Sequence, residues 1–275
     1  MTGRRELLKL AAATCAAPAA ALGFGIITRK DFRINEVELK FPSLPDDLSG
    51  LRMLQLSDIH LGEFYRPEDL ARVVDASNHL RPDLAFITGD LITKKGDPLD
   101  RCLLELRRLR AGYGIWGCLG NHEQIAKAEA YAQARARELD IFFLRNEADP
   151  LIFGNSRLNL VGVDYEKQGP YLRNIQGLVD PGAFNLLLAH TPNVFPTAAD
   201  KGFDLTLSGH THGGQINLDV LGTNINVAEL RTPYTKGLYT LPTSMIYVNS
   251  GLGTIGWPVR LGAPPEITVI RLSRG

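Results

Sequence analysis

The sequence has few cysteines and no excess of either charge. Its three cysteines, Cys15, Cys102 and Cys118, form no CxxC pair and no paired framework, so we expect neither a disulfide scaffold nor a thiolate metal site. Lysine plus arginine and aspartate plus glutamate number 30 each, which gives a formal net charge of zero. Without a basic field we expect no nucleic-acid partner, and without an acidic excess we expect no extended disorder.

The first 27 residues differ in composition from the rest of the chain. A basic start with Arg4, Arg5 and Lys9 precedes an Ala-rich apolar run from Leu10 to Ile27, which is the layout of an export signal. The Arg4–Arg5 pair, followed by "ELLK", resembles a twin-arginine signal. An ordinary secretory signal or a single membrane anchor is the alternative, because a bilayer crossing needs about 20 residues and the run is close to that length.

We therefore expect an exported bacterial protein that is anchored in a membrane or released into the periplasm or cell wall. The twin-arginine translocase is the expected export partner, and residues 1–27 are the signal or anchor. The motif "AATC" before Cys15 is a poor lipobox, because Thr14 occupies a position where glycine or alanine is expected. Lipid attachment at Cys15 is therefore not expected.

Strand and helix patterns alternate along the first half of the chain. Short apolar runs predict strands at 51–58, 82–90 and 113–123. Helical spacing and strong helix formers predict helices at 68–80, 97–110 and 124–140. This alternation is typical of an α/β layered domain.

The second half of the chain contains mostly strands. We expect them at 156–164, 184–190, 203–210, 244–251 and 265–272, with short helices near 170–180 and 193–201. Two mixed sheets packed face to face, with helices outside, would place both halves in one α/β domain. We expect that domain to cover residues 51–275, after a linker and leading strand at 28–50.

Five of the six histidines occupy the same kind of position. His79 lies inside a predicted helix, and we assign it a structural role. The other five fall at or just past the end of a predicted strand, as do two aspartates and an asparagine: His60, His122, His190, His210, His212, Asp58, Asp90 and Asn121. Ligand sites in α/β sheets lie outside these strand ends, so satisfied structural histidines, or aspartates that serve only as helix N-caps, are the weaker interpretation.

The spacing of these residues favours metal binding. Asp58 and His60, in "SDIH", are two residues apart, and an extended backbone points such side chains the same way. His210 and His212, in "SGHTHGGQ", share this spacing. Glycines beside these positions let the backbone approach closely; they are Gly89, Gly120, Gly209, Gly213 and Gly214.

The type and number of ligands indicate two ions. Imidazole and carboxylate without thiolate suit zinc, manganese or iron. Asn121 and His122 are adjacent and point apart, so that one can bind metal while the other faces a substrate. The seven candidate ligands are too many for one ion but fit two ions bridged by a carboxylate, which is an arrangement that serves in-line displacement at phosphorus; they are Asp58, His60, Asp90, Asn121, His190, His210 and His212.

The ordered blocks "SDIH", "TGD", "GNHE", "LAH" and "GHTHGGQ" resemble the signature of the calcineurin-like metallophosphoesterases, over about residues 51 to 272. The resemblance implies a four-layer α/β sandwich with a dinuclear centre. One metal would be held by Asp58, His60, Asp90 and His212, and the other by Asp90, Asn121, His190 and His210. His122 matches the catalytic histidine that protonates or stabilises the leaving oxygen. The N-terminus and "GHTHGGQ" resemble the exported, membrane-associated bacterial branch.

The expected function is metal-dependent hydrolysis of phosphate esters in the cell envelope. A phosphodiesterase or pyrophosphatase is the main hypothesis, with a lipid-linked or nucleotide-sugar substrate. A phosphomonoesterase is the alternative enzyme, and a non-catalytic metal-stabilised scaffold is the alternative of another class. The presence of His122 argues against the scaffold, which has no use for an imidazole aimed away from the metals.

Two further features have open interpretations. Arg260, in "WPVRLG", is a candidate for binding a substrate phosphate. The stretch 213–243 contains glycine and asparagine and has little periodicity. It forms either a lid or substrate wall, or an ordinary hairpin excursion.

Overall fold

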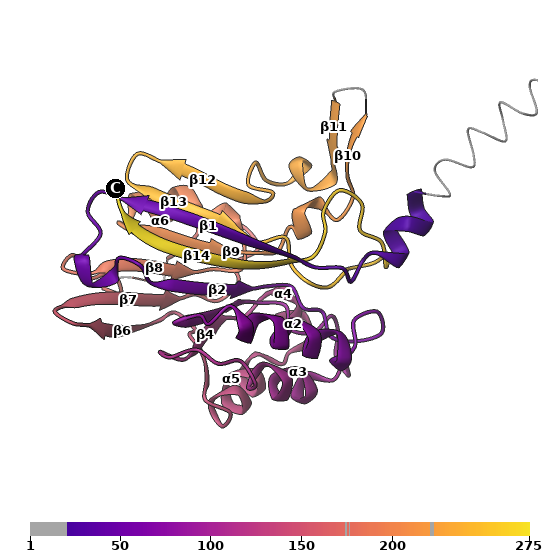
Figure 1. The fold of residues 1–275 in the computed structure, drawn as a ribbon, viewed down its shortest axis with the longest axis horizontal. Helices are drawn as coiled ribbons and strands as arrows, with labels where there is room; N and C mark the ends of the chain where they lie inside the picture. Colours follow the sequence, from indigo (N-terminus) through magenta and orange to yellow (C-terminus); the bar gives the residue numbers. More distant parts are fainter. Residues whose placement is uncertain (1–20, 174, 176, 221–222) are drawn as a thin grey trace, which may run out of the picture.

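Two six-stranded sheets form the centre of the protein (Figure 1). The computed structural model describes residues 21–173, 175, 177–220 and 223–275. The first sheet has the order β1-β14-β2-β3-β4-β5, with bounds Arg33–Phe41, Glu266–Arg274, Arg52–Leu56, Leu84–Thr88, Ile115–Cys118 and Ile141–Phe143. The second has the order β12-β13-β9-β8-β7-β6, with bounds Gly237–Leu241, Ser244–Val248, Leu205–Ser208, Phe184–Leu188, Ser156–Gly162 and Glu147–Phe153.

Both sheets are mixed, with a parallel centre. Strands β2 to β5 are parallel to one another, because a helical crossover joins each successive pair. Strands β7, β8, β9 and β13 are also parallel, while β6 and β12 pair antiparallel at the edges. Parallel strands present their carboxyl ends at one edge of a sheet. The loops that follow β2, β3 and β4 therefore lie at one edge of the first sheet, and the loops that follow β8 and β9 lie at one edge of the second.

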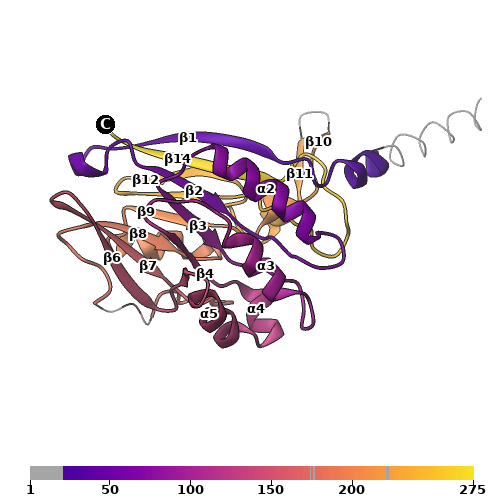
Figure 2. The same ribbon diagram turned by 60° about the horizontal axis from the view of Figure 1, so that its bottom comes forward.

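Helices cover the outer faces of both sheets (Figure 2). Their bounds are Pro67–His79 for α2, Leu99–Leu106 for α3, Asn121–Ala126 for α4, Glu129–Arg137 for α5 and Phe195–Asp200 for α6. Val73 of α2 packs with Ile87 of the first sheet, and Ala198 of α6 packs on the second. Phe86 and Leu186 belong to a separate core between the sheets. The expected four-layer α/β sandwich is confirmed.

Two helices differ from the sequence-based expectation. The run 124–140 is divided, because Lys127 adopts the left-handed conformation (φ 55°) between α4 and α5. Helix propensity does not reveal where packing interrupts a helix. The helix expected near 170–180 is absent from the described residues, which form turns there. Gly177, with φ 81°, and Pro181 both disfavour a helix.

Two segments outside the alternating strand and helix pattern also take regular structure. Strand β1 pairs in parallel with β14 along nine residues, so the leading strand is an edge of the first sheet. The stretch 213–243 contains the hairpin β10–β11, a short 3₁₀ helix η4 and strand β12; β10 is Asn217–Val220, β11 Thr223–Asn226 and η4 Val227–Leu230. Further 3₁₀ turns are η1 (Asp46–Leu48), η2 (Pro192–Val194) and η3 (His212–Gly214).

Residues 21–27 are helical and lead into the domain. The Gly25 carbonyl accepts a hydrogen bond of 3.1 Å from the backbone N–H of Arg260. The arginine pair Arg4–Arg5 and Cys15 lie outside the described residues. Within the part that the structure describes, none of the helices combines the length and the apolar character that a bilayer crossing requires.

Candidate metal centre

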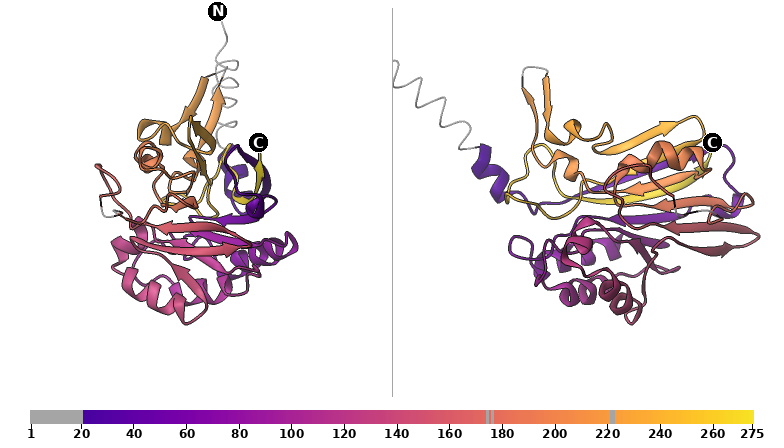
Figure 3. Two further views of the ribbon diagram at one scale, coloured as in Figure 1. Left: turned by 90° about the vertical axis from the view of Figure 1, so that its left-hand side faces the viewer. Right: turned by 180° about the vertical axis from the view of Figure 1, so that it is seen from behind.

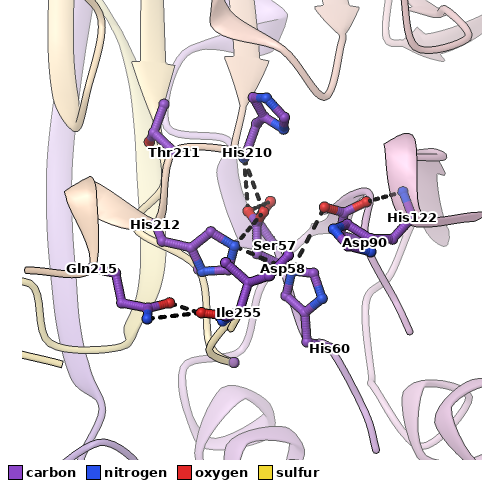
Figure 4. Close-up of polar contacts among 12 residues, drawn as sticks. Ser57, Asp58, His60, Asp90, His122, His210, Thr211, His212, Gln215 and Ile255 are labelled. Carbon is purple, nitrogen blue, oxygen red and sulfur yellow. Dashed lines mark hydrogen bonds and ion pairs between the residues drawn. The ribbon is translucent and has the colours of Figure 1, made fainter. Parts of the chain in front are cut away.

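Eight polar side chains meet where strands of the two sheets end, and Figure 4 labels six of them: Asp58, His60, Asp90, His122, His210 and His212. Three come from the first sheet's β2 and β3, two begin α4 directly after β4, and three follow β8 and β9 of the second sheet. They are Asp58, His60, Asp90, Asn121, His122, His190, His210 and His212. All the candidate ligands that the sequence singled out are thus brought together from segments far apart in the chain.

The backbone at these positions is not extended, contrary to the sequence-based argument. Five of the eight residues have φ between 48° and 72°; they are Asp58, His60, Asp90, His210 and His212. The strands end two or more residues earlier, and the chain turns immediately beyond them. The left-handed conformation costs energy for residues other than glycine, and it concentrates at functional sites. Here it lets His210 and His212, two residues apart, point toward different clusters.

Two glycines permit these close approaches. A Cβ atom at Gly209 would collide with the side chains of Ser57 and Asp58, and one at Gly120 would collide with the Asp90 carboxylate. The absence of these side chains lets both carboxylates lie directly against neighbouring backbone. Asp58 uses this contact to accept hydrogen bonds from the N–H of His210 at 3.0 and 2.9 Å.

The first cluster contains Asp58, His60 and His212, whose ligand atoms lie within 4.8 Å of one another. The Nε2 atoms of His60 and His212 are 3.2 Å apart, and His212 Nε2 is 3.4 Å from Asp58 Oδ1. His60 Nδ1 lies 3.1 Å from the Thr93 hydroxyl. A hydrogen bond there fixes the ring and leaves Nε2 free to accept, as in metal-ligating histidines.

The second cluster contains Asp90, His190 and His210, with Asn121 beside them. His190 Nδ1 donates to the Thr88 carbonyl at 2.7 Å, so Nε2 is the ring nitrogen that faces the cluster. That Nε2 lies 3.1 Å from Asn121 Oδ1, 3.1 Å from His210 Nδ1 and 3.0 Å from Asp90 Oδ2. Three potential ligand atoms therefore lie within 3.1 Å of His190 Nε2.

Asp90 connects the two clusters. Its Oδ2 is 3.0 Å from His190 Nε2 and 3.6 Å from His60 Nε2. Its Oδ1 accepts a hydrogen bond of 2.9 Å from the His122 N–H. Because one carboxylate faces histidines of both groups, Asp90 has the position that a bridging ligand requires.

The donor atoms fit divalent cations. Two histidine ring nitrogens face each other at 3.2 Å in the first cluster and at 3.1 Å in the second, so a cation bound between them would take a lone pair from each. Burial lowers the pKa of His60 to about 4 and that of His210 to about 3, so both imidazoles are neutral near pH 7 and free to ligate. Burial opposes protonation of His190 as well, but the Asp90 and Asp58 carboxylates raise its pKa to about 10, so a metal ion that binds at Nε2 would displace a proton.

Glu123, which the sequence analysis left without a role, holds the loop after β3. Its carboxylate is fully buried and accepts hydrogen bonds from four backbone N–H groups, at 2.8–3.3 Å. The donors are Asp90, Leu91, Ile92 and Gly120. Its place in the "GNHE" block, next to the histidine, was the available signal. Glu123 thereby fixes Asp90 and the start of α4 relative to each other.

His122 borders both the metal cluster and the open cavity. Its ring is 4.8 Å from that of His60, centroid to centroid, and the side chain lines the cavity. His122 Nδ1 lies 2.5 Å from the Thr93 carbonyl, which is an acceptor. Nδ1 therefore carries a proton, and Nε2 is the atom available for proton transfer.

A cavity of about 750 Å³ opens above the clusters. Asp90, Asn121, His122, His210 and His212 contribute to its floor. Its walls add residues that the sequence analysis did not single out: Tyr165, Lys167, Gln168, Thr191, Pro192, Asn193, Gln215, Val227, Ala228, Arg231, Thr232 and Ile255. Part of the stretch 213–243 thus forms a wall of the site. Tyr165 follows the end of β7, so the strand-end argument would have found it.

Arg260 lies behind the first cluster and is not among the residues that line the cavity. Its side chain is 3% exposed and donates to the carbonyls of Gly253, Ser250 and Ala263. Its Nη2 is 3.3 Å from His212 Nδ1. The arginine suggested as a phosphate ligand therefore supports the loop after β13 and one face of His212 in this structure.

The sequence matches known metallophosphoesterases over most of its length. The family profile of the calcineurin-like phosphoesterases matches residues 51–214. The uncharacterised metallophosphoesterase YkuE of Bacillus subtilis is 31% identical over 98% of this chain and 97% of its own length. A "Transmembrane protein with metallophosphoesterase domain" from Danio rerio is 32% identical over 88% of this chain, which spans only 57% of that longer protein.

The fold also matches a solved structure. The crystal structure of TT1561 from Thermus thermophilus superposes with a TM-score of 0.51, over 74% of this chain and 91% of that protein. The sequence identity is 12%, so this likeness concerns the fold alone.

Proposed function

This chain belongs to the calcineurin-like phosphoesterase family and is a metal-dependent phosphoesterase, and we propose that it cleaves phosphodiesters or pyrophosphates with two divalent ions. The observation that carries this proposal is the pair of His/Asp clusters, connected by Asp90, on the floor of an open cavity. Such a floor joins a site for cations to a space that can hold a substrate.

The residues that would hold the ions follow from the two clusters. One ion would take Asp58, His60, Asp90 and His212, and the other Asp90, Asn121, His190 and His210. Bound there, the ions would act as Lewis acids on the phosphoryl oxygens and lower the pKa of the attacking water. The nitrogen and oxygen donors suit manganese, iron or zinc.

His122 is placed to move the proton that the leaving group needs. The Thr93 carbonyl and the Asp90 carboxylate hold its ring nitrogen Nδ1 and its backbone N–H, respectively. The Nε2 atom is then free for an ester oxygen in the cavity. Proton donation at that oxygen is the general-acid role that we assign to His122.

The size of the cavity favours substrates with a group on each side of the phosphorus. Its volume of about 750 Å³ lies in the range typical of pockets that hold whole small molecules. Lys167 and Arg231 add positive charge to the walls, and Tyr165 adds an aromatic ring 5.5 Å from that of His210. These walls would contact both ester groups of a diester, whereas a phosphomonoester would leave much of the cavity unused.

We place the enzyme in the cell envelope on the basis of its N-terminal sequence. Arg4 and Arg5 precede the apolar run that leads into the helix at 21–27. The Danio rerio relative is named as a transmembrane protein, which supports membrane association here. Export through the twin-arginine translocase would deliver a folded chain, in which the ligands from residues 58 to 212 are already assembled.

The proposal is tested by a substrate panel with metal-loaded, full-length protein. The panel contains bis(p-nitrophenyl) phosphate, p-nitrophenyl phosphate and a nucleotide-sugar pyrophosphate. We expect the highest kcat/KM for the diester or the pyrophosphate. A higher value for p-nitrophenyl phosphate would replace the proposal with a phosphomonoesterase. No turnover of any of the three, with metals bound, would favour the scaffold.

A further inference from the structure

Three segments at one end of the molecule expose large apolar side chains. They are the helix at 21–27, the stretch 215–231 and the loop 251–261, which lie together in the views of Figures 1 and 3. Nine of the seventeen exposed large apolar side chains among the described residues belong to them. We call these nine the apolar rim: Leu22, Phe24, Ile26, Ile27, Leu218, Val227, Leu230, Ile255 and Trp257.

Hydrogen bonds and close packing join the three segments, with the loop 251–261 in contact with both of the others. The loop N–H of Arg260 donates to the Gly25 carbonyl, and a Cβ atom on Gly25 would collide with Leu261. The N–H of Asn217 donates to the Leu261 carbonyl at 2.7 Å. The Gln215 amide donates to the carbonyls of Ile255 and Trp257 at 3.0 and 2.9 Å. The helix at 21–27 and the hairpin thus attach to the same loop.

The apolar rim adjoins the opening of the catalytic cavity. Val227 and Ile255 of the rim also line the cavity, together with Gln215 between the two segments. Gln215 is separated from the candidate ligand His212 by two glycines. Apolar groups therefore surround one side of a site whose floor is polar and whose walls carry Lys167 and Arg231.

We propose that the apolar rim docks on a lipid bilayer, and that the substrate is the phosphodiester or pyrophosphate head group of a membrane lipid. This inference rests on the proposed function, because it names the substrate class of that site. The occupant follows from the chain itself, whose apolar run from Leu10 to Ile27 ends in this surface. Tryptophan and phenylalanine favour the level of lipid head groups, and the rim presents both.

Several side chains of the apolar rim are largely exposed. Trp257 is 77% exposed, Leu230 86% and Ile27 78%. Single exposed apolar residues are common, but nine of them on three joined segments beside a cavity indicate an interaction site. With the rim in the bilayer surface, the cavity opening lies at the depth of the lipid phosphates, so a head group reaches the metal centre without leaving the membrane.

Fluorescence of Trp257 tests the docking directly. The chain has two tryptophans, of which Trp116 is 6% exposed, so a Trp257→Phe variant supplies the background spectrum. Full-length, metal-loaded protein is mixed with vesicles of phosphatidylcholine and phosphatidylglycerol, with and without brominated acyl chains. We expect a blue-shifted Trp257 emission that brominated lipid quenches. Co-sedimentation with vesicles while Trp257 keeps the emission of a water-exposed indole would overturn the docking, as would a failure to sediment.

The substrate class is tested with a matched pair of double variants. Trp257→Ser with Leu230→Ser removes two rim side chains that do not line the cavity. The control, Ile152→Ser with Leu104→Ser, removes exposed apolar side chains from β6 and α3, which are 60% and 38% exposed. We expect all three proteins to hydrolyse bis(p-nitrophenyl) phosphate equally. Cleavage of vesicle-borne phosphatidylglycerol or of a polyprenyl pyrophosphate should fall about tenfold or more in the rim variant alone, as expected when two large apolar groups are lost from a binding surface.

The two readouts separate this inference from the proposed function. Wild-type protein that hydrolyses bis(p-nitrophenyl) phosphate but neither lipid would overturn the substrate class and leave the phosphodiesterase standing. Equal lipid turnover by the rim variant and the control would likewise overturn it. Loss of diester hydrolysis in the metal-loaded wild type would instead reject the proposed function itself.

Discussion

The floor of the cavity and its apolar rim differ in burial and in how their positions are fixed. Asp90 and His212 are 2% and 4% exposed; the backbone N–H of His122 donates to the Asp90 carboxylate, and the Arg260 side chain lies 3.3 Å from His212 Nδ1. Trp257, in the loop 251–261, is 77% exposed, and Leu230, at the end of the 3₁₀ turn η4, is 86% exposed. The buried residues of the floor are held in fixed positions, as a metal site requires. The exposed residues of the rim lie on surface segments, where binding specificity can vary between relatives.

The largest effect is expected at the residue that joins the two clusters of the floor. Asp90→Asn removes a carboxylate charge that faces histidines of both clusters, so both cations should bind more weakly. We expect turnover to fall by about 10³-fold or more, because several kcal/mol of transition-state stabilisation depend on the ions. Elemental analysis measures the metal content. Asp100→Asn, at an exposed carboxylate, is the control. Two tightly bound ions in Asp90→Asn would exclude the bridging role.

A smaller loss of turnover is expected when the site keeps both metal ions but loses the proposed proton donor, His122. His122→Ala should retain both ions and lower turnover by about 10²–10⁴-fold, the usual contribution of a general acid. The loss should be smaller for p-nitrophenyl esters than for alkyl esters, because a good leaving group needs little protonation. Steady-state kinetics on the two ester types, with His79→Ala as the control, measure this difference. Equal losses for both types would contradict the acid role.

A third variant tests whether Arg260 stabilises the structure behind the metal clusters or binds the substrate. Arg260→Met leaves the carbonyls of Gly253, Ser250 and Ala263 without their buried donor. We expect the free energy of unfolding to fall by about 1.5–3 kcal/mol, since buried carbonyls lose hydrogen bonds from a charged donor. KM for bis(p-nitrophenyl) phosphate should stay nearly the same while kcat falls several-fold. A rise in KM with unchanged stability would instead make Arg260 a phosphate ligand.

The smallest effect on turnover is expected from the N-terminal segment that leads to the rim. Arg4→Lys with Arg5→Lys preserves the charge of the signal and should leave catalysis unchanged. Twin-arginine recognition should fail, so the active enzyme should accumulate in the cytoplasm. Activity in cell fractions measures this redistribution. Wild-type levels of envelope activity in the double variant would indicate a Sec-type signal or a plain anchor.

The same contrast explains what the sequence could and could not predict. The parallel strands and their terminal acids and histidines were visible, because buried strands are apolar runs and ligands must follow their ends. The left-handed backbone at Asp58 and His60 was not visible, since local propensity favours other conformations there and tertiary contacts impose this one. The role of Glu123 was missed for a related reason, because its four partners are backbone groups that leave no pattern in side-chain chemistry.

The rim was the least predictable part of the molecule. Residues 213–243 have no clear periodicity, and their structure depends on contacts with a loop about 40 residues further along. No sequence pattern joins the helix at 21–27 to the catalytic cavity either, because the connection runs through backbone hydrogen bonds of Gly25 and Arg260.

The central claim is that two cations, joined by Asp90, make this chain a phosphodiesterase. The most direct test is a titration of metal-free, full-length protein with Mn²⁺, in which bound metal and hydrolysis of bis(p-nitrophenyl) phosphate are measured on the same samples. We predict saturation at two ions per chain, with turnover rising to its maximum as the second site fills. Full activity at one ion per chain, or activity that persists after complete metal removal, would contradict the account.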